Sequence, residues 1–195
     1  MLLVYKSYQK FDFGYDEIVA EYVGRPDNIE IYNRNLELLS EYYGRAEIMF
    51  ENDRGEVLSY FKRKGKMNLL ADQPDNVISK VIKDSTVSRI KGCHMNERMK
   101  DAGEKFILRW LWTERGTNNE DHKVYNMDLI PSPGLIEELI GYFRGGNFDR
   151  VMALMQVMFM VEESYEEEVG AKKRRNKAAD YLVSNISSMF SRSRR

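Results

Sequence analysis

The chain has 195 residues, of which 43% are hydrophobic and 31% are charged, and its net charge is −1. This length can bury one core and is too short for a second full domain, so we expect one domain with a tail. The single cysteine, Cys93, excludes a disulfide framework, and with only His94 and His122 beside it a structural zinc site is disfavoured. No apolar run reaches the length of a membrane span, which predicts a soluble cytosolic protein with no membrane partner.

The first part of the sequence predicts two strands followed by a capped helix. Leu2–Tyr5 and Glu17–Tyr22 are predicted strands, separated by a polar and aromatic turn. Asp27, with Glu30 three residues later, forms a capping-box pattern at the start of a helix that ends at Gly44. Strands that alternate with helices favour a mixed or parallel sheet with helical cover.

The segment Arg45–Gly55 is the stretch around which we expect the sheet to be organised. Apolar and other residues alternate along its first half, in the order Ala46, Glu47, Ile48, Met49, Phe50 and Glu51. This alternation predicts a strand, and the apolar spacing after Gly55 predicts a helix. Glu51 then ends a strand at the sheet edge where α/β proteins bind ligands, which makes it the leading acidic candidate. The alternative interpretation of Glu51, Asn52 and Asp53 is a polar turn with a helix cap.

The middle of the sequence gives a weaker pattern. Val77–Ile82 fits either a short amphipathic helix or a pair of strands, and Thr86–Cys93 fits a further strand followed by a loop. Asn96–Trp112 has the apolar spacing of a helix, whereas Thr113–His122 has the composition of a polar turn.

Two further helices are predicted before the tail. The first begins at Pro133 and ends at Gly145, and the second is capped by Asn147 and runs to Met160. After its first turn the second helix is apolar almost all round, so we expect it to be buried. Asp149, in that first turn, is interpreted either as an acid that complements the helix dipole or as a metal-binding carboxylate presented towards the sheet edge.

The tail changes abruptly from acidic to basic. Glu162–Glu168 is an acidic block, Lys172–Lys177 is a basic block, and arginines close the chain. Three interpretations are open: a solvated, partly helical tail, a basic arm for a phosphate backbone, or a partner-binding amphipathic helix over Tyr181–Phe190.

Four motifs together resemble a known family. The predicted central strand ends in Glu51–Gly55 (ENDRG), and the last apolar helix begins within Gly146–Leu154 (GNFDRVMAL). Tyr125–Met127 (YNM) and Pro133–Leu139 (PGLIEEL) lie between them. In this order and spacing, over roughly residues 2–162, the chain resembles the nuclease domain of large terminase subunits, the DNA-packaging motors of tailed bacteriophages.

The resemblance implies an α/β fold with an RNase H-like mixed sheet flanked by helices over residues 1–162, and a charged C-terminal tail, helical or flexible and basic, over residues 163–195. It also implies a metal-dependent endonuclease that cuts concatemeric viral DNA. Glu51 and Asp149 match two of the family's three core acids, and Asp53 is a further candidate metal ligand. Hard cations take carboxylate oxygens, so Mg²⁺ or Mn²⁺ is the expected cofactor.

The resemblance further implies double-stranded DNA, the portal protein and the small terminase subunit as partners. The expected location is the host cell cytoplasm, transiently at the procapsid portal vertex. The sequence departs from the family in two respects: it has no residues for the strand that precedes Leu2 and carries the first catalytic aspartate, and it has no phosphate-binding loop of an ATPase. We therefore expect a C-terminal piece of a large terminase, and the alternative is a fragment that binds DNA or packaging partners without cutting.

Overall fold

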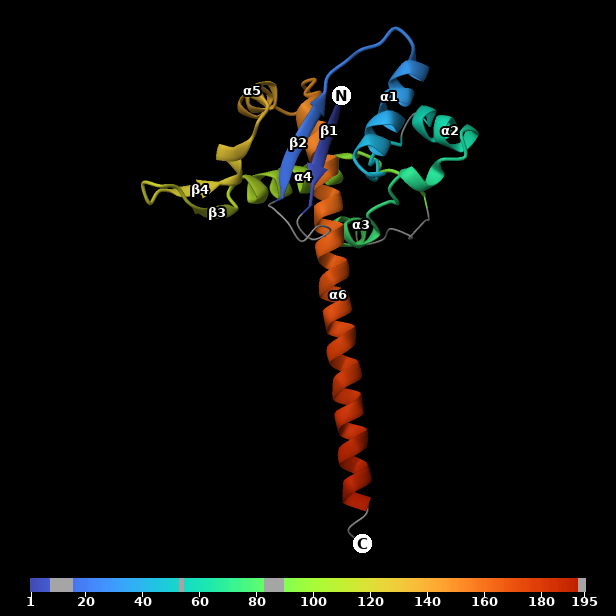
Figure 1. The fold of residues 1–195 in the computed structure, drawn as a ribbon, viewed down its shortest axis with the longest axis vertical. Helices are drawn as coiled ribbons and strands as arrows, with labels where there is room; N and C mark the ends of the chain where they lie inside the picture. The colour runs from blue at the N-terminus through green and yellow to red at the C-terminus, as the bar shows by residue number, and fades with distance from the viewer. Residues whose placement is uncertain (8–15, 53–54, 83–89, 193–195) are drawn as a thin grey trace.

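A computed structural model describes residues 1–7, 16–52, 55–82 and 90–192 of the protein. In the last helix, side chains are described through Lys172 and at Lys177. The fold is mixed α/β, with six α-helices and two small antiparallel sheets in these ranges (Figure 1). In chain order the elements are β1 (Leu2–Lys6), β2 (Glu17–Tyr22), α1 (Ile29–Tyr42), α2 (Glu56–Arg63), η2 (Met67–Leu69), α3 (Asp75–Val81), α4 (Glu97–Leu111), β3 (Glu114–Thr117), β4 (Lys123–Tyr125), η3 (Asn126–Leu129), α5 (Pro133–Gly141) and α6 (Asp149–Arg192).

The two predicted N-terminal strands are confirmed. β1 and β2 pair antiparallel, with Leu2 opposite Tyr22 and Lys6 opposite Glu17. Among the described strands β1 pairs only with β2, so no strand from the described ranges lies along its other edge. One face of this hairpin packs on α6, which runs beside β1 (Figure 1).

The helix after the hairpin is confirmed, but its predicted cap is wrong. Asn28 caps α1, because its side-chain oxygen accepts a hydrogen bond from the backbone N–H of Glu30 at 2.8 Å. Asn and Asp are equally good caps, and it is Asn28 that has the extended backbone a cap requires. Asp27 therefore precedes the cap.

The segment predicted as the central strand is extended, but it makes only isolated bridges. Ile48 bridges Leu70 and Glu51 bridges Cys93, both in parallel orientation. The predicted alternation is confirmed, since Ile48 and Phe50 are buried and Glu51 is exposed. A single mixed sheet with this segment inside it is not present in the described ranges, because no described strand connects the segment to β1.

Later elements agree with the sequence in part. The ambiguous stretch at Val77–Ile82 is helix α3, and the predicted helices α2, α4 and α5 are confirmed. Half of the stretch Thr86–Cys93, residues 86–89, lies outside the described residues, and in the other half Lys91 bridges Asp72 and Cys93 bridges Glu51. The predicted polar turn at Thr113–His122 is wrong in its first part, because Glu114–Thr117 forms β3, which pairs with β4. β3 is largely exposed and lacks the apolar alternation that marks a strand.

Helix α6 is much longer than predicted. It begins at Asp149 and continues past Met160 without interruption to Arg192. Figure 1 shows its C-terminal part running away from all other elements. No helix in the described ranges combines the length and apolar character that crossing a membrane requires.

The buried residues of the described ranges form two clusters. The larger cluster surrounds α6 and includes Leu154 and Phe159, which have no exposed surface. The smaller cluster joins α1, α2 and η2 to the extended segment, and includes Leu36, Ile48 and Phe61. The predicted burial of the first part of α6 is thus confirmed on the side that faces the larger cluster.

Candidate functional site

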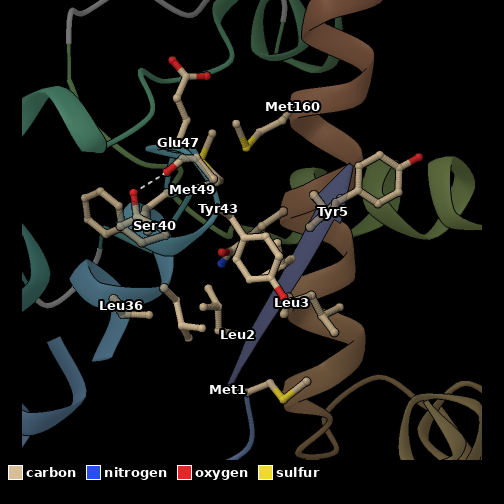
Figure 2. A pocket seen from close by; sticks show the side chains of 18 of the residues that line it. Met1, Leu2, Leu3, Tyr5, Leu36, Ser40, Tyr43, Glu47, Met49 and Met160 are labelled. Atoms are coloured by element: carbon tan, nitrogen blue, oxygen red, sulfur yellow. Dashed lines mark hydrogen bonds between the residues drawn. The ribbon is translucent and has the colours of Figure 1, made fainter. Parts of the chain in front are cut away.

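A cavity of about 1060 Å³ lies between the two clusters, and we call it the inter-core cavity. Its walls come from β1, from α1, from residues 44–51 and from the first turns of α6 (Figure 2). The walls are mainly apolar. Figure 2 shows Met49 and Met160 pointing towards each other, with Leu2 and Leu36 further along the cavity.

Both leading site residues line this cavity. Glu51 follows the extended segment and Asp149 opens α6, and both side chains are exposed. Glu47 and Glu56 also line it, and the sequence analysis did not select either of them. Glu47 shares the alternation that places Glu51, so the pattern contained a signal for it, whereas Glu56 is an ordinary first-turn acid of α2.

The position of Asp149 is fixed by the residues that hold the start of α6. One carboxylate oxygen of Glu138 accepts the backbone N–H groups of Arg150 at 2.8 Å and Val151 at 3.3 Å, which satisfies two donors of the first turn. The guanidinium of Arg150 donates to Glu138 at 2.7 Å and to Glu21 of β2 at 2.6 Å. These hydrogen bonds raise the pKa of Arg150 further, so β2, α5 and α6 share a permanent ionic contact.

Close packing supports the same contact. A Cβ atom on Gly134 would lie 2.8 Å from the Arg150 guanidinium, so a side chain there would require the guanidinium to move. Ser132, one residue before α5, donates from its hydroxyl to Glu21 and accepts the backbone N–H of Leu135 at 3.1 Å. The first helical turn that carries Asp149 is therefore attached to two other elements.

Tyr32 of α1 is hydrogen-bonded to Met1, next to the start of β1. Its hydroxyl donates to the backbone oxygen of Met1 at 3.1 Å, and its ring lines the cavity. Burial, followed by the nearby Tyr22 and Asp149, raises the pKa of the Tyr32 hydroxyl above its usual value. Tyr32 thus ties α1 to the Met1 end of the cavity.

The backbone around Glu51 is held by Cys93. The N–H of Cys93 donates to the Phe50 oxygen at 2.8 Å, and the N–H of Asn52 donates to the Cys93 oxygen at 3.2 Å. Gly92 allows this approach, because it has a φ of +79° and a Cβ there would lie 2.6 Å from the Phe50 oxygen. Cys93 itself is fully buried.

The donor set has suitable chemistry for a hard cation, but it is small. Carboxylates such as those of Glu51 and Asp149 are the ligands that Mg²⁺ and Mn²⁺ prefer. Within the part of the chain that the structure describes, no three His, Cys, Asp or Glu side chains are grouped to hold a metal ion. The third candidate, Asp53, lies outside the described residues.

Comparison with known proteins found no matching protein-family model, curated protein or solved structure. Over the residues that the structure describes, the protein belongs to the mixed α/β class, with two small antiparallel sheets. The resemblance to large terminase subunits is carried by the sequence motifs at Glu51–Gly55 and Gly146–Leu154 and by those between them, and no comparison tests it.

Proposed function

We propose that this chain is the nuclease-type domain of a phage large terminase, a metal-dependent endonuclease that cuts concatemeric viral DNA during packaging. One observation supports this proposal above the others: Glu51 and Asp149 belong to motifs far apart in the sequence, yet they line the same cavity. The RNase H-like assignment, double-stranded DNA, the portal protein and the small terminase subunit as partners, and action in the host cytoplasm and at the procapsid portal vertex, are parts of the same proposal.

The roles of the two acids follow from electrostatics. Two carboxylates within about 4–6 Å of each other repel unless a cation or a proton compensates them, and the proposal requires Glu51 and Asp149 to come that close when the metal binds. Glu51 and Asp149 would hold Mg²⁺ or Mn²⁺, which when bound activates water and neutralises charge on the scissile phosphate. The contacts of Glu138 and Arg150 would keep Asp149 in place, since a metal ligand works best on a rigid element.

A second function is favoured by the small number of ligands. The described residues offer no group of three metal-binding side chains, and an incomplete ligand set fixes neither the metal nor the water. A chain of this kind binds DNA or packaging partners and cuts slowly or not at all. The two functions differ in the measured rate of cleavage.

The test is cleavage of supercoiled plasmid in Mn²⁺ by the unmodified chain and by the Glu51→Ala and Asp149→Ala variants. Glu56→Ala is the matched control, because Glu56 lines the same cavity but belongs to no motif. The nuclease proposal expects slow cutting that both site variants abolish and the control keeps. Cutting that survives both site substitutions would show that other residues carry the activity.

A second arm separates the two functions. The chain is extended at its N-terminus by an aspartate-bearing strand, and cleavage and DNA binding are measured together. A nuclease that lacks one ligand gains cleavage from the extension and keeps its DNA affinity. DNA binding without cutting, both with and without the extension, would support the second function, and the absence of both activities would contradict both.

A further inference from the structure

We propose that α6 binds a second copy of this chain through an antiparallel pair of helices centred on Gly170. In this pair, acidic residues of each α6 lie opposite basic residues of the other. Neither DNA nor a metal ion takes part, so this association and the proposed nuclease function can fail independently.

The second half of α6 leaves the rest of the protein. The helix is continuous over 44 residues, a length of about 66 Å at 1.5 Å per residue. Glu163 and Glu166 still contact α3, through the N–H groups at its start and through Lys80. Beyond them, Figure 1 shows the helix extending away from the other described elements. Helices in proteins are stabilised mainly by an amphipathic face that packs on a neighbour, and the described elements supply none for this half.

The sequence of α6 carries the heptad repeat of a coiled coil. Its a and d positions, alternately three and four residues apart, form what we call the α6 seam: Val161, Tyr165, Glu168, Lys172, Arg175, Ala179, Leu182, Ile186 and Met189. Towards the N-terminus the same repeat reaches Met158, Leu154 and Val151, which are buried in the larger cluster. The repeat is therefore a packing surface inside the body that continues outside it, where Tyr165 is exposed.

The residues beside the seam are those of a helix contact. The flanking positions e and g are uncharged over residues 164–185, where they are Ser164, Val169, Ala171, Asn176, Ala178, Val183 and Asn185. In the same range the charged residues outside the seam take the outer positions b, c and f, where they are Glu166, Glu167, Lys173, Arg174, Lys177 and Asp180. This distribution leaves one side of the helix suited to a partner helix and the other to water.

The charged residues in the middle of the seam select the partner. In an antiparallel pair centred on Gly170, Glu168 lies opposite Lys172 of the second copy, and Tyr165 lies opposite Arg175 of the second copy. Glu168 and Lys172 already form an ion pair within one helix at 2.6 Å, so two copies bring together four charges of alternating sign. A guanidinium over an aromatic ring is also attractive. The seam is therefore complementary to a second copy of itself.

Other arrangements of two copies lose this complementarity. A parallel pair would place Glu168, Lys172 and Arg175 each opposite the same residue of the other copy. Sliding the antiparallel pair by one heptad would either place Lys172 opposite Arg175 or leave these charges without opposite charges across the seam. Like charges across a helix pair are destabilising, and coiled coils exclude wrong partners in this way. The charge pattern thus specifies a two-fold symmetric, antiparallel contact.

The first test is sedimentation of the full chain over a range of protein concentrations, which gives the dissociation constant of the dimer. The unmodified chain is expected to dimerise. Glu168→Lys and Lys172→Glu should each raise the dissociation constant by about tenfold or more, because each places like charges opposite each other twice per dimer. Glu167→Lys and Lys177→Glu are the matched controls at outer positions, and each should change it by less than about threefold.

A mixture of the Glu168→Lys chain with the Lys172→Glu chain separates the contact between copies from the ion pair within one helix. Each variant alone lacks its intrahelical ion pair, and mixing cannot restore that pair. Mixing does place opposite charges across the α6 seam, so heterodimers are expected with the affinity of the unmodified chain to within about threefold. The proposal would be overturned by an unmodified chain that stays monomeric, by equal effects of the control substitutions, or by a mixture without heterodimers.

Disulfide trapping tests the orientation of the two helices. Cys93 is fully buried, so a single substitution on α6 supplies the accessible thiol. The Tyr165→Cys chain and the Arg175→Cys chain are mixed and equilibrated in a glutathione buffer. The antiparallel register predicts disulfides between the two different chains, because only these thiols lie opposite each other. Disulfides mainly between two copies of the same variant would show a parallel pair and overturn the proposal.

Discussion

Replacing Glu138 with alanine is expected to lower the free energy of unfolding by about 2–3 kcal/mol. Its carboxylate makes three hydrogen bonds at the start of α6: to the backbone N–H groups of Arg150 and Val151, and to the Arg150 guanidinium at 2.7 Å. A hydrogen bond to a charged group contributes about 1.5–3 kcal/mol, and an acid at a helix N-terminus contributes about 0.3–1 kcal/mol. These values do not add fully, because Arg150 keeps its contact with Glu21 and water reaches the freed N–H groups.

The assay is urea unfolding followed by circular dichroism, with Glu137→Ala as the control. Glu137 is the preceding residue of α5 and is exposed, so its replacement changes helix propensity in the same way and should alter stability by less than about 0.5 kcal/mol. The inference that the Glu138 carboxylate holds the start of α6 would be refuted by equal effects of the two substitutions. It would also be refuted if Glu138→Ala lowered the free energy of unfolding by less than about 1 kcal/mol.

Two further substitutions test the core and the electrostatics. Phe159→Ala should cost about 3–5 kcal/mol in urea unfolding, because Phe159 has no exposed surface, whereas the same change at Phe143, which is 63% exposed, should cost far less. Glu37→Gln should cost about 1 kcal/mol at pH 7. The Lys66 ammonium, and after it the Tyr60 hydroxyl, hold the pKa of the Glu37 carboxyl below its usual value. The stability that the ionised Glu37 carboxylate gives is present above the unfolded pKa of about 4.3 and is lost as the pH falls through the lower folded pKa. The difference in free energy of unfolding between variant and parent should therefore shrink towards about pH 3. A difference that stays constant with pH would contradict this prediction.

Elements marked by local signals could be predicted from the sequence. The helix at Asn96–Trp112 is an example, since the Asn96 side chain accepts the N–H of Met99 at 3.1 Å at the predicted start. The same is true of Ser132 before α5. A cap and an apolar spacing are properties of neighbouring residues, so they are visible without knowledge of the tertiary structure.

Features that depend on distant residues could not be predicted. The alternation around Ile48 correctly gave its burial, but whether that segment joins a larger sheet depends on which backbone lies beside it. The length of α6 is a second case. Glu163, assigned to the tail by composition, accepts the N–H groups of Asn76 and Val77 at the start of α3, and Glu166 forms an ion pair with Lys80 at 2.5 Å. Charge composition alone cannot show that the acidic block packs on the body of the protein.

The candidate site contains features of both kinds, some marked by local sequence signals and some dependent on distant residues. The sequence pattern selected Glu51 and Asp149, and the structure places both on the inter-core cavity. The pattern did not select Glu47 and Glu56, because acids on a strand face or in a first helical turn are ordinary features. The sequence also gave no measure of the inter-core cavity, because its size follows from how α1 and α6, which both line it, pack in the folded chain.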